Sequence, residues 1–239
     1  MRNRPFAVAV ALVALVWAGA VPAYEGVTVT GGGSIRGTVK LQGTAPAPKE
    51  IETTKDREVC GAHKLIDESL IVASGGGIKN AVVSITNITR GKALDTTGKP
   101  ELDQHGCTYV PHVLTVPAGS ELQIRNSDGI LHNIHTYSTR NPPMNRAQPK
   151  FKKVITETFS QPETIRTTCD AHGWMQGWLI VIEHPYYAVT DDNGGFQLTD
   201  VPAGDYELKV WHEKLGEQTQ KVVVAGAGQV SADFLLTPK

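Results

Sequence analysis

The chain has 239 residues, with 23 Lys and Arg against 24 Asp and Glu, so its formal net charge is −1. This balance lacks the basic excess of nucleic-acid-binding proteins, and we expect no nucleic-acid partner. Glycine (24) and proline (14) are frequent, and the sequence has no long apolar stripe with a helical period. These features predict an all-β protein.

The first residues have the anatomy of a secretory signal peptide. Arg2 and Arg4 precede an apolar run over residues 6–18, and small residues follow it. We expect cleavage after Ala20 or Ala23, so that residues 1–23 are removed and the protein is exported to the periplasm or the extracellular space. No later stretch approaches the roughly 20 apolar residues of a spanning helix, so we expect no membrane span in the mature protein.

Residues 24–102 are interpreted as an N-terminal β segment. Residues 24–33 form a polar, Gly-rich leader that we expect to be mobile. Apolar and polar residues then alternate over residues 34–41, which predicts a half-buried strand. Further strand candidates are residues 69–72 and 81–85.

Residues 103–184 carry the densest β pattern. The predicted strands are residues 112–116, 121–125, 130–137, 154–159, 164–169 and 178–182. A long excursion over residues 139–153, rich in proline, asparagine and basic residues, interrupts them. This density of short strands is typical of a small Greek-key sandwich.

Three cysteines are an odd count for an exported protein, which leaves one thiol over. The simplest arrangement is a Cys60–Cys107 disulfide with Cys169 free, because a metal-bound thiolate cannot also be bridged. A closed zinc site formed by Cys60, His63, Cys107 and His112 is an alternative, since two cysteines and two histidines make a full tetrahedral set. Unpaired thiols without a role are a third interpretation.

A short motif carries the chemistry of this chain. Cys169, His172 and Met175 supply a thiolate, an imidazole and a thioether at intervals of three residues. Soft sulfur ligands with imidazole suit copper that cycles between two oxidation states. Such a site needs a second imidazole from a neighbouring strand, and His132 is the natural candidate. His135 lies three residues later and should face the opposite side of the strand, as a surface or supporting residue.

Over residues 103–184 the chain resembles the cupredoxins, the small blue copper proteins that include plastocyanin, azurin and amicyanin. The resemblance rests on the order of Pro117-Ala118-Gly119, Asn126, His132-Asn133 and Cys169-x-x-His172-x-x-Met175.

This resemblance implies one type 1 copper ion. His132, Cys169 and His172 would be its equatorial ligands and Met175 its weak axial ligand. Asn133 and Thr168 would then tie the strand of His132 to the ligand loop through hydrogen bonds.

The implied function is that of an exported one-electron carrier with an unidentified redox protein as partner, and not that of an enzyme. Rival interpretations are a copper chaperone or storage protein, and a structural surface protein with a vestigial site. A copper enzyme would need a further centre with several histidines, and no His-x-His pair is available among His63, His105, His112, His135, His184 and His212.

Residues 185–239 resemble the carboxypeptidase regulatory-like domain, a transthyretin-like β-sandwich. The matching motifs are Thr190-Asp191-Asp192-Asn193-Gly194-Gly195-Phe196 and Val201-Pro202-Ala203-Gly204-Asp205-Tyr206. The resemblance implies an accessory role, and it leaves His212 and Glu213 without an assigned partner. Residues 35–41 resemble the first strand of the same fold. This raises the alternative that the copper module is inserted within the second sandwich.

Overall fold

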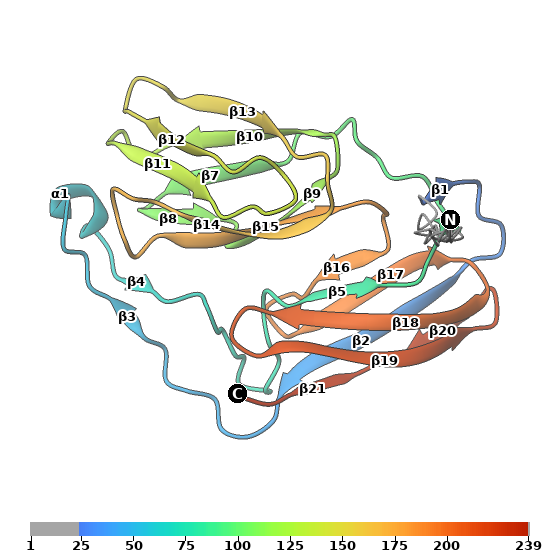
Figure 1. Ribbon diagram of the computed structural model, residues 1–239. Coiled ribbons are helices and arrows are strands. Elements are labelled where there is room, and N and C mark those ends of the chain that lie inside the picture. Colours follow the sequence, from blue (N-terminus) through green and yellow to red (C-terminus); the bar gives the residue numbers. More distant parts are fainter. Residues whose placement is uncertain (1–23, 239) are drawn as a thin grey trace, which may run out of the picture.

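The computed structural model describes residues 24–238, which form two β-sandwiches (Figure 1). Within this range the structure has one short helix, so the predicted all-β class is confirmed. Also within residues 24–238, no helix has both the length and the apolar character needed to cross a membrane. The expected signal peptide, residues 1–23, lies outside the described residues.

The central sandwich is built from residues 101–182. Its first sheet has the order β13-β10-β7-β8, with the bounds Val154–Thr158, Glu121–Asn126, Glu101–His105 and Thr108–Val110. Its second sheet has the order β12-β11-β14-β15-β9, with the bounds Asn145–Gln148, His132–Thr136, Glu163–Thr168, Gln176–Ile182 and Val113–Pro117.

The terminal sandwich combines strands from both ends of the chain. One sheet has the order β16-β5-β18-β19, with the bounds Tyr187–Val189, Val82–Ile85, Gly204–His212 and Gly216–Val224. The other contains β17, β2 and β20, with β21 also on β2, and their bounds are Gly195–Val201, Gly33–Leu41, Gln229–Ser231 and Phe234–Leu236. The early strands β2 and β5 therefore complete the C-terminal sandwich, and the central sandwich lies between them and β16 in sequence.

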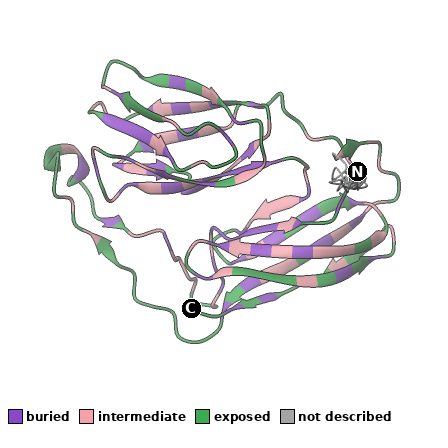
Figure 2. Ribbon diagram, in the orientation of Figure 1, coloured by how far each residue is buried: buried purple, intermediate pink, exposed green. Residues whose placement is uncertain are grey.

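Alternating side chains explain why these segments form strands. In β10, Leu122, Ile124 and Asn126 are buried, and the two residues between them are half-buried. In β2, Ile35 and Val39 are buried on the same principle. Figure 2 shows this alternation along the strands of both sandwiches. The period of two places one set of side chains in the core and the other toward solvent.

Residues 49–67 form a strap that leaves the terminal sandwich, reaches one end of the central sandwich and returns (Figure 1). The strap is a hairpin of β3 (Glu50–Ile51) and β4 (Leu65–Ile66), with helix α1 (Arg57–Cys60) at its tip. Cys60 and Leu65 are buried in the core of the central sandwich. The strap is therefore packed against this sandwich and does not lie free in solvent.

The two sandwiches meet through an apolar contact and a hydrogen bond between an imidazole and a carboxylate. Trp178 of the central sandwich packs edge-on against Trp211 of the terminal one, with ring centroids 4.9 Å apart. His112 Nε2 pairs with the Glu213 carboxylate, and both side chains are almost fully buried. Glu213 thus has a partner in the other sandwich.

Three local expectations differ from the structure. The leader is tied down, because β1 (Glu25–Gly26) pairs with β6 (Arg90–Gly91). Residues 69–72 form only an isolated bridge from Val72, since the Asp67 carboxylate binds the Ser69 N–H and favours a turn. The excursion over residues 139–153 contains β12, which pairs with β11.

Candidate metal centre

Three donor atoms converge at one end of the central sandwich. His132 Nδ1 lies 3.0 Å from His172 Nδ1, and Cys169 Sγ lies 3.9 Å from the first and 3.8 Å from the second. The three side chains are buried, with at most 1% of each residue exposed. They form one of the two groups of residues 24–238 whose geometry could hold a metal ion.

Two strand ends and one loop position these donors. His132 begins β11, and Cys169 directly follows β14, which pairs with β11. Residues 169–175 form the connection to β15, which is closed by hydrogen bonds from Cys169 N–H to the Met175 carbonyl (3.2 Å) and from Met175 N–H to the His172 carbonyl (2.9 Å). The loop therefore turns His172 back toward Cys169.

Asn133 connects the strand of His132 to this loop. Its backbone N–H donates to Cys169 Sγ at 3.4 Å, and its side-chain oxygen accepts the N–H groups of Asp170 and Ala171. A hydrogen bond to the sulfur and a fixed ligand loop are the contributions expected of a residue that supports a metal site.

The Thr168 hydroxyl does not tie the strand of His132 to the ligand loop, as the resemblance implies that it would. It donates to the Tyr137 hydroxyl at 3.4 Å, on the outer side of the sheet. The Thr168 carbonyl is held instead by Tyr109, whose hydroxyl lies 2.9 Å from it and 2.6 Å from the Asn133 carbonyl. Tyr109 is fully buried, so its hydroxyl fastens the strands of His132 and Cys169 to each other from inside the core.

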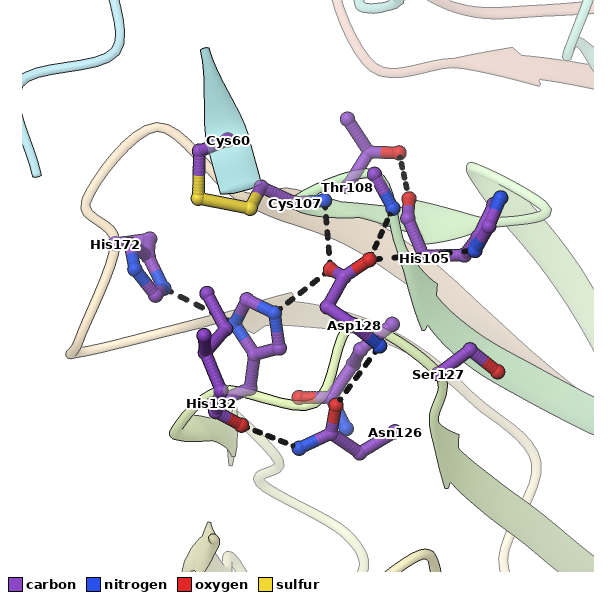
Figure 3. A network of polar contacts seen from close by, with 12 residues as sticks. Cys60, His105, Cys107, Thr108, Asn126, Ser127, Asp128, His132 and His172 are labelled. Atoms are coloured by element: carbon purple, nitrogen blue, oxygen red, sulfur yellow. Dashed lines mark hydrogen bonds and ion pairs between the residues drawn. A yellow bond between two sulfur atoms is a disulfide. The ribbon is translucent and has the colours of Figure 1, made fainter. Parts of the chain in front are cut away.

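Each imidazole has a carboxylate on its outer nitrogen. Asp128 Oδ2 lies 2.8 Å from His132 Nε2, and Asp56 Oδ2 lies 2.8 Å from His172 Nε2. Figure 3 shows Asp128 between the His132 ring and the backbone N–H of Cys107, beside the Cys60–Cys107 disulfide. A carboxylate at Nε2 keeps the proton there and leaves Nδ1 as the metal-binding atom.

The loop that carries Asp128 is shaped by Asn126. The Asn126 amide donates to the carbonyls of Ile130 and Gln148, each at 2.8 Å, and its oxygen accepts the Asp128 N–H. Gly129 has φ +70°, a left-handed conformation that glycine adopts without strain. Asn126 and Gly129 therefore direct the Asp128 carboxylate back to His132.

The donor set fits copper. Zinc bond lengths, about 2.0 Å to imidazole and about 2.3 Å to thiolate, show how far apart the ligands of one such metal ion lie. Bonds of these lengths to one ion would place the donor atoms at close to the separations observed here. One thiolate and two imidazoles in a dry pocket form the plane of a blue copper site. His132, Cys169 and His172 are the residues that would hold the ion.

The electrostatics favour the metal-binding forms of the cysteine and of His172. Burial alone would raise the pKa of the Cys169 thiol, but the adjacent His132 imidazole and the backbone N–H of Asn133 lower it below its usual value. Burial lowers the pKa of His172 despite the opposing effect of Asp56. Burial would also lower the pKa of His132, but Asp128 and Cys169 raise it to about 8. Thiolate and neutral imidazole are the forms that bind a metal.

Met175 is buried in the same core cluster as Cys169, and its backbone closes the ligand loop. Its axial role stays a prediction. His135 lies outside the donor group and pairs with Asp170 at 3.0 Å on the partly exposed side of the sheet.

Cys60 and Cys107 form a disulfide, and Cys169 is free. The zinc alternative lacks its two thiolates, and its fourth residue, His112, is paired with Glu213.

Asp56, Asp128 and Tyr109 have roles that the sequence motifs do not predict. Asp128 precedes His132 by only four residues, so a search for carboxylates near ligand histidines would find it. Asp56 and Tyr109 carry no such local signal, because they lie 116 and 59 residues from His172 and Thr168, the residues they contact.

One comparison with known proteins identifies the C-terminal part of the chain. A family model described as the carboxypeptidase regulatory-like domain matches residues 175–237, which confirms that resemblance. No curated protein matches the chain.

Structural neighbours of the chain include cupredoxins. A purple cupredoxin from Nitrosopumilus maritimus is 18% identical over 35% of this chain and 100% of its own, with a TM-score of 0.30. Amicyanin from Paracoccus versutus is 18% identical over 35% of this chain and 81% of its own, with a TM-score of 0.31.

A copper-containing nitrite reductase from Thermus scotoductus is 23% identical over 39% of this chain, with a TM-score of 0.32, and the match spans 24% of the reductase. TM-scores this low establish no common fold, so function rests on the geometry of the site.

Proposed function

We propose that this chain is an exported carrier of single electrons that binds one type 1 copper ion. His132, Cys169 and His172 would be the equatorial ligands and Met175 the weak axial ligand. The proposal rests on three buried donor atoms that face one another at distances one ion can span. When bound there, copper supplies a reversible one-electron couple.

The residues of the chain contribute rigidity and the exclusion of water. The β11–β14 pairing, the Asn133 contacts and the closed loop over residues 169–175 all restrain the donors. A donor set that cannot rearrange imposes one compromise geometry on both oxidation states, which permits rapid electron exchange. A partner redox protein would deliver and remove the electrons.

A copper chaperone or storage protein would use the same donors, but it must release the ion. Two features favour retention: the donors are buried, and carboxylates occupy the outer nitrogens of both imidazoles. An enzyme would need a second centre. In the described part of the chain the other candidate group is Cys107, Asp128 and His132, and the Cys107 sulfur is already bridged.

Export is supported by the N-terminal sequence and by the disulfide, because structural disulfides persist in oxidising compartments.

The test is reconstitution of the purified protein with Cu(II). We expect one copper per chain, an intense absorption at about 600 nm from the thiolate–Cu(II) bond, and reversible reduction with the metal retained. Cys169→Ser should abolish the absorption. His132→Asn should abolish it too, and His135→Asn, on the same strand but outside the donor group, should leave it intact.

Three outcomes would overturn the proposal. A colourless protein without copper would favour a structural role with a vestigial site. Copper that leaves during redox cycling or passes to a competing chelator within minutes would favour a chaperone. An absorption that survives Cys169→Ser would exclude this thiolate as ligand.

A further inference from the structure

The tip of the strap lies against the candidate metal centre. Lys55 Nζ donates to the Ala171 carbonyl at 3.3 Å, and Asp56 reaches the His172 ring. His172 has no exposed surface although it belongs to a loop at the end of the sandwich. A segment more than 100 residues away in sequence therefore covers this imidazole.

Asp56 has an unusual conformation for a helix cap, and its contact with His172 offsets the cost of that conformation. Asp56 is the N-cap residue of α1, where an aspartate normally accepts a backbone N–H of the first helical turn. Its side chain makes no such capping bond, and its backbone is left-handed with φ 49°. Both features cost stability locally. The compensating interaction is the hydrogen bond to His172 Nε2.

One disulfide joins the supports of both imidazoles. Cys60 lies four residues after Asp56 and is bonded to Cys107. The N–H groups of Gly106 and Cys107 donate to the Asp128 carboxylate at 2.6 and 2.8 Å, and Asp128 holds His132. The segment that anchors the strap therefore also fixes the second carboxylate.

We propose that Asp56 is a positioning residue of the copper centre. Through Asp56 the strap places a second carboxylate, besides Asp128, on the outer nitrogen of a ligand imidazole, and the two carboxylates stabilise Cu(II) over Cu(I). This inference rests on the proposed function. The physical reason is that a carboxylate at Nε2 makes an imidazole a stronger donor, and a negative charge close to the metal favours the more highly charged ion. The two carboxylates therefore lower the reduction potential of the site.

The decisive variant is Asp56→Asn in the full-length mature protein. Asparagine tolerates a left-handed backbone and can still accept a hydrogen bond, so the substitution removes the charge and keeps the shape. Asp170→Asn is the matched control. It removes a carboxylate next to Cys169 that binds His135 and Asn145 and touches neither ligand imidazole.

The readout is the reduction potential by voltammetry, together with the absorption spectrum. We expect Asp56→Asn to keep the visible band and to have a higher potential than both the wild type and Asp170→Asn. A merely covering role of the strap would leave the potentials of the two variants equal. If both variants bind copper and remain blue, equal reduction potentials would overturn the inference about Asp56 and leave the proposed function standing. A wild type that takes up no copper would overturn the proposed function and the claim about the potential with it.

A measurement on the metal-free protein covers the case in which Asp56→Asn does not retain copper. Nitrogen-15 spectra should show His172 as the Nε2–H tautomer in the wild type, with this preference weakened in Asp56→Asn and unchanged in Asp170→Asn. An identical tautomer of His172 in all three proteins would contradict the positioning role of Asp56.

Discussion

The backbone N–H of Asn133 donates to the Cys169 sulfur at 3.4 Å, from the residue that directly follows His132. The same residue binds the N–H groups of Asp170 and Ala171 through its side chain. Asn133 therefore holds both the thiolate and the start of the ligand loop.

Asn133→Ala keeps the backbone hydrogen bond to sulfur but removes the side-chain acceptor, so two loop N–H groups lose their partner. Copper affinity should fall about 10- to 100-fold, as is usual when a residue that orients metal ligands is removed. Competition with a chelator of known affinity measures this. Asn193→Ala, in an exposed turn of the terminal sandwich, is the control. Equal affinities of the two variants would contradict the assigned role.

Replacing Cys60 and Cys107 by serine opens a loop with a sequence separation of 47 residues. The chain-entropy model predicts that the free energy of unfolding falls by about 4 kcal/mol. Denaturant unfolding followed by tryptophan fluorescence reports the change. Reductant should reproduce the loss in the wild type and have no effect on the variant. A reductant-insensitive wild type would show that the disulfide contributes little.

Glu163 holds the start of the 139–153 excursion. Its carboxylate accepts the N–H groups of Thr139, Arg140 and Asn141 at 2.5, 3.1 and 3.1 Å. Burial alone would raise the pKa of Glu163. Hydrogen bonds from the Thr139 N–H, the Asn141 side-chain amide, the Thr139 hydroxyl and the Arg140 N–H lower it to about 2 in the folded protein.

In the unfolded chain this carboxyl has a pKa of about 4.3. Its contribution to the free energy of unfolding is therefore complete above that pH and is lost as the pH falls toward about 2. Glu163→Gln should be less stable than the wild type at neutral pH. The difference should shrink between about pH 4.5 and pH 2 in thermal unfolding. A difference that does not change over this range would show that the carboxylate charge is not involved.

Gly37 in β2 lies against β17 and the C-terminal strands. A Cβ at this position would overlap the Ala232 carbonyl and crowd the Phe196 ring. Gly37→Ala should cost about 3 kcal/mol, at the upper end of the usual range for overpacking. Gly98→Ala, where a Cβ meets open space, is the matched control. Equal melting temperatures would mean that β2 is not packed as described.

The terminal sandwich needs strands from both ends of the chain, because β2 lies beside β17 and β5 beside β18. Residues 185–239 alone should therefore fail to fold, since they lack both strands. A chain in which a short Gly/Ser linker replaces residues 92–184 should regain a cooperative unfolding transition. Circular dichroism and thermal unfolding distinguish the two shortened proteins, and a folded 185–239 fragment would contradict the prediction.

The fold class and the donor set could be predicted from the sequence because both depend on local pattern. Alternation over residues 34–41 and 121–125 reflects strands with one buried face, and the structure has β2 and β10 there. The ligand motif Cys169-x-x-His172 follows a strand directly, so its geometry is fixed within a few residues. His132 could be located because ligands collect where neighbouring strands end.

The outer carboxylate on His172 could not be predicted in this way. Asp56 lies 116 residues before its partner. The expected Cys60–Cys107 disulfide brings residues 49–67 to the central sandwich, but it does not indicate that Asp56 reaches the His172 ring. The notable feature of Asp56, a left-handed cap without a capping bond, is visible only in the structure. The pairing of His112 with Glu213 depends in the same way on how the two sandwiches meet.

The sequence by itself therefore indicated the all-β class, most of the strands, and the three residues His132, Cys169 and His172 that the structure brings together. Only the tertiary structure decided what surrounds them: the strap over His172, the disulfide that anchors it, and the insertion of one sandwich into the other. The physical reason is that strand periodicity and ligand spacing act over a few residues. Contacts between distant segments are set instead by strand order and by the packing of complete sandwiches.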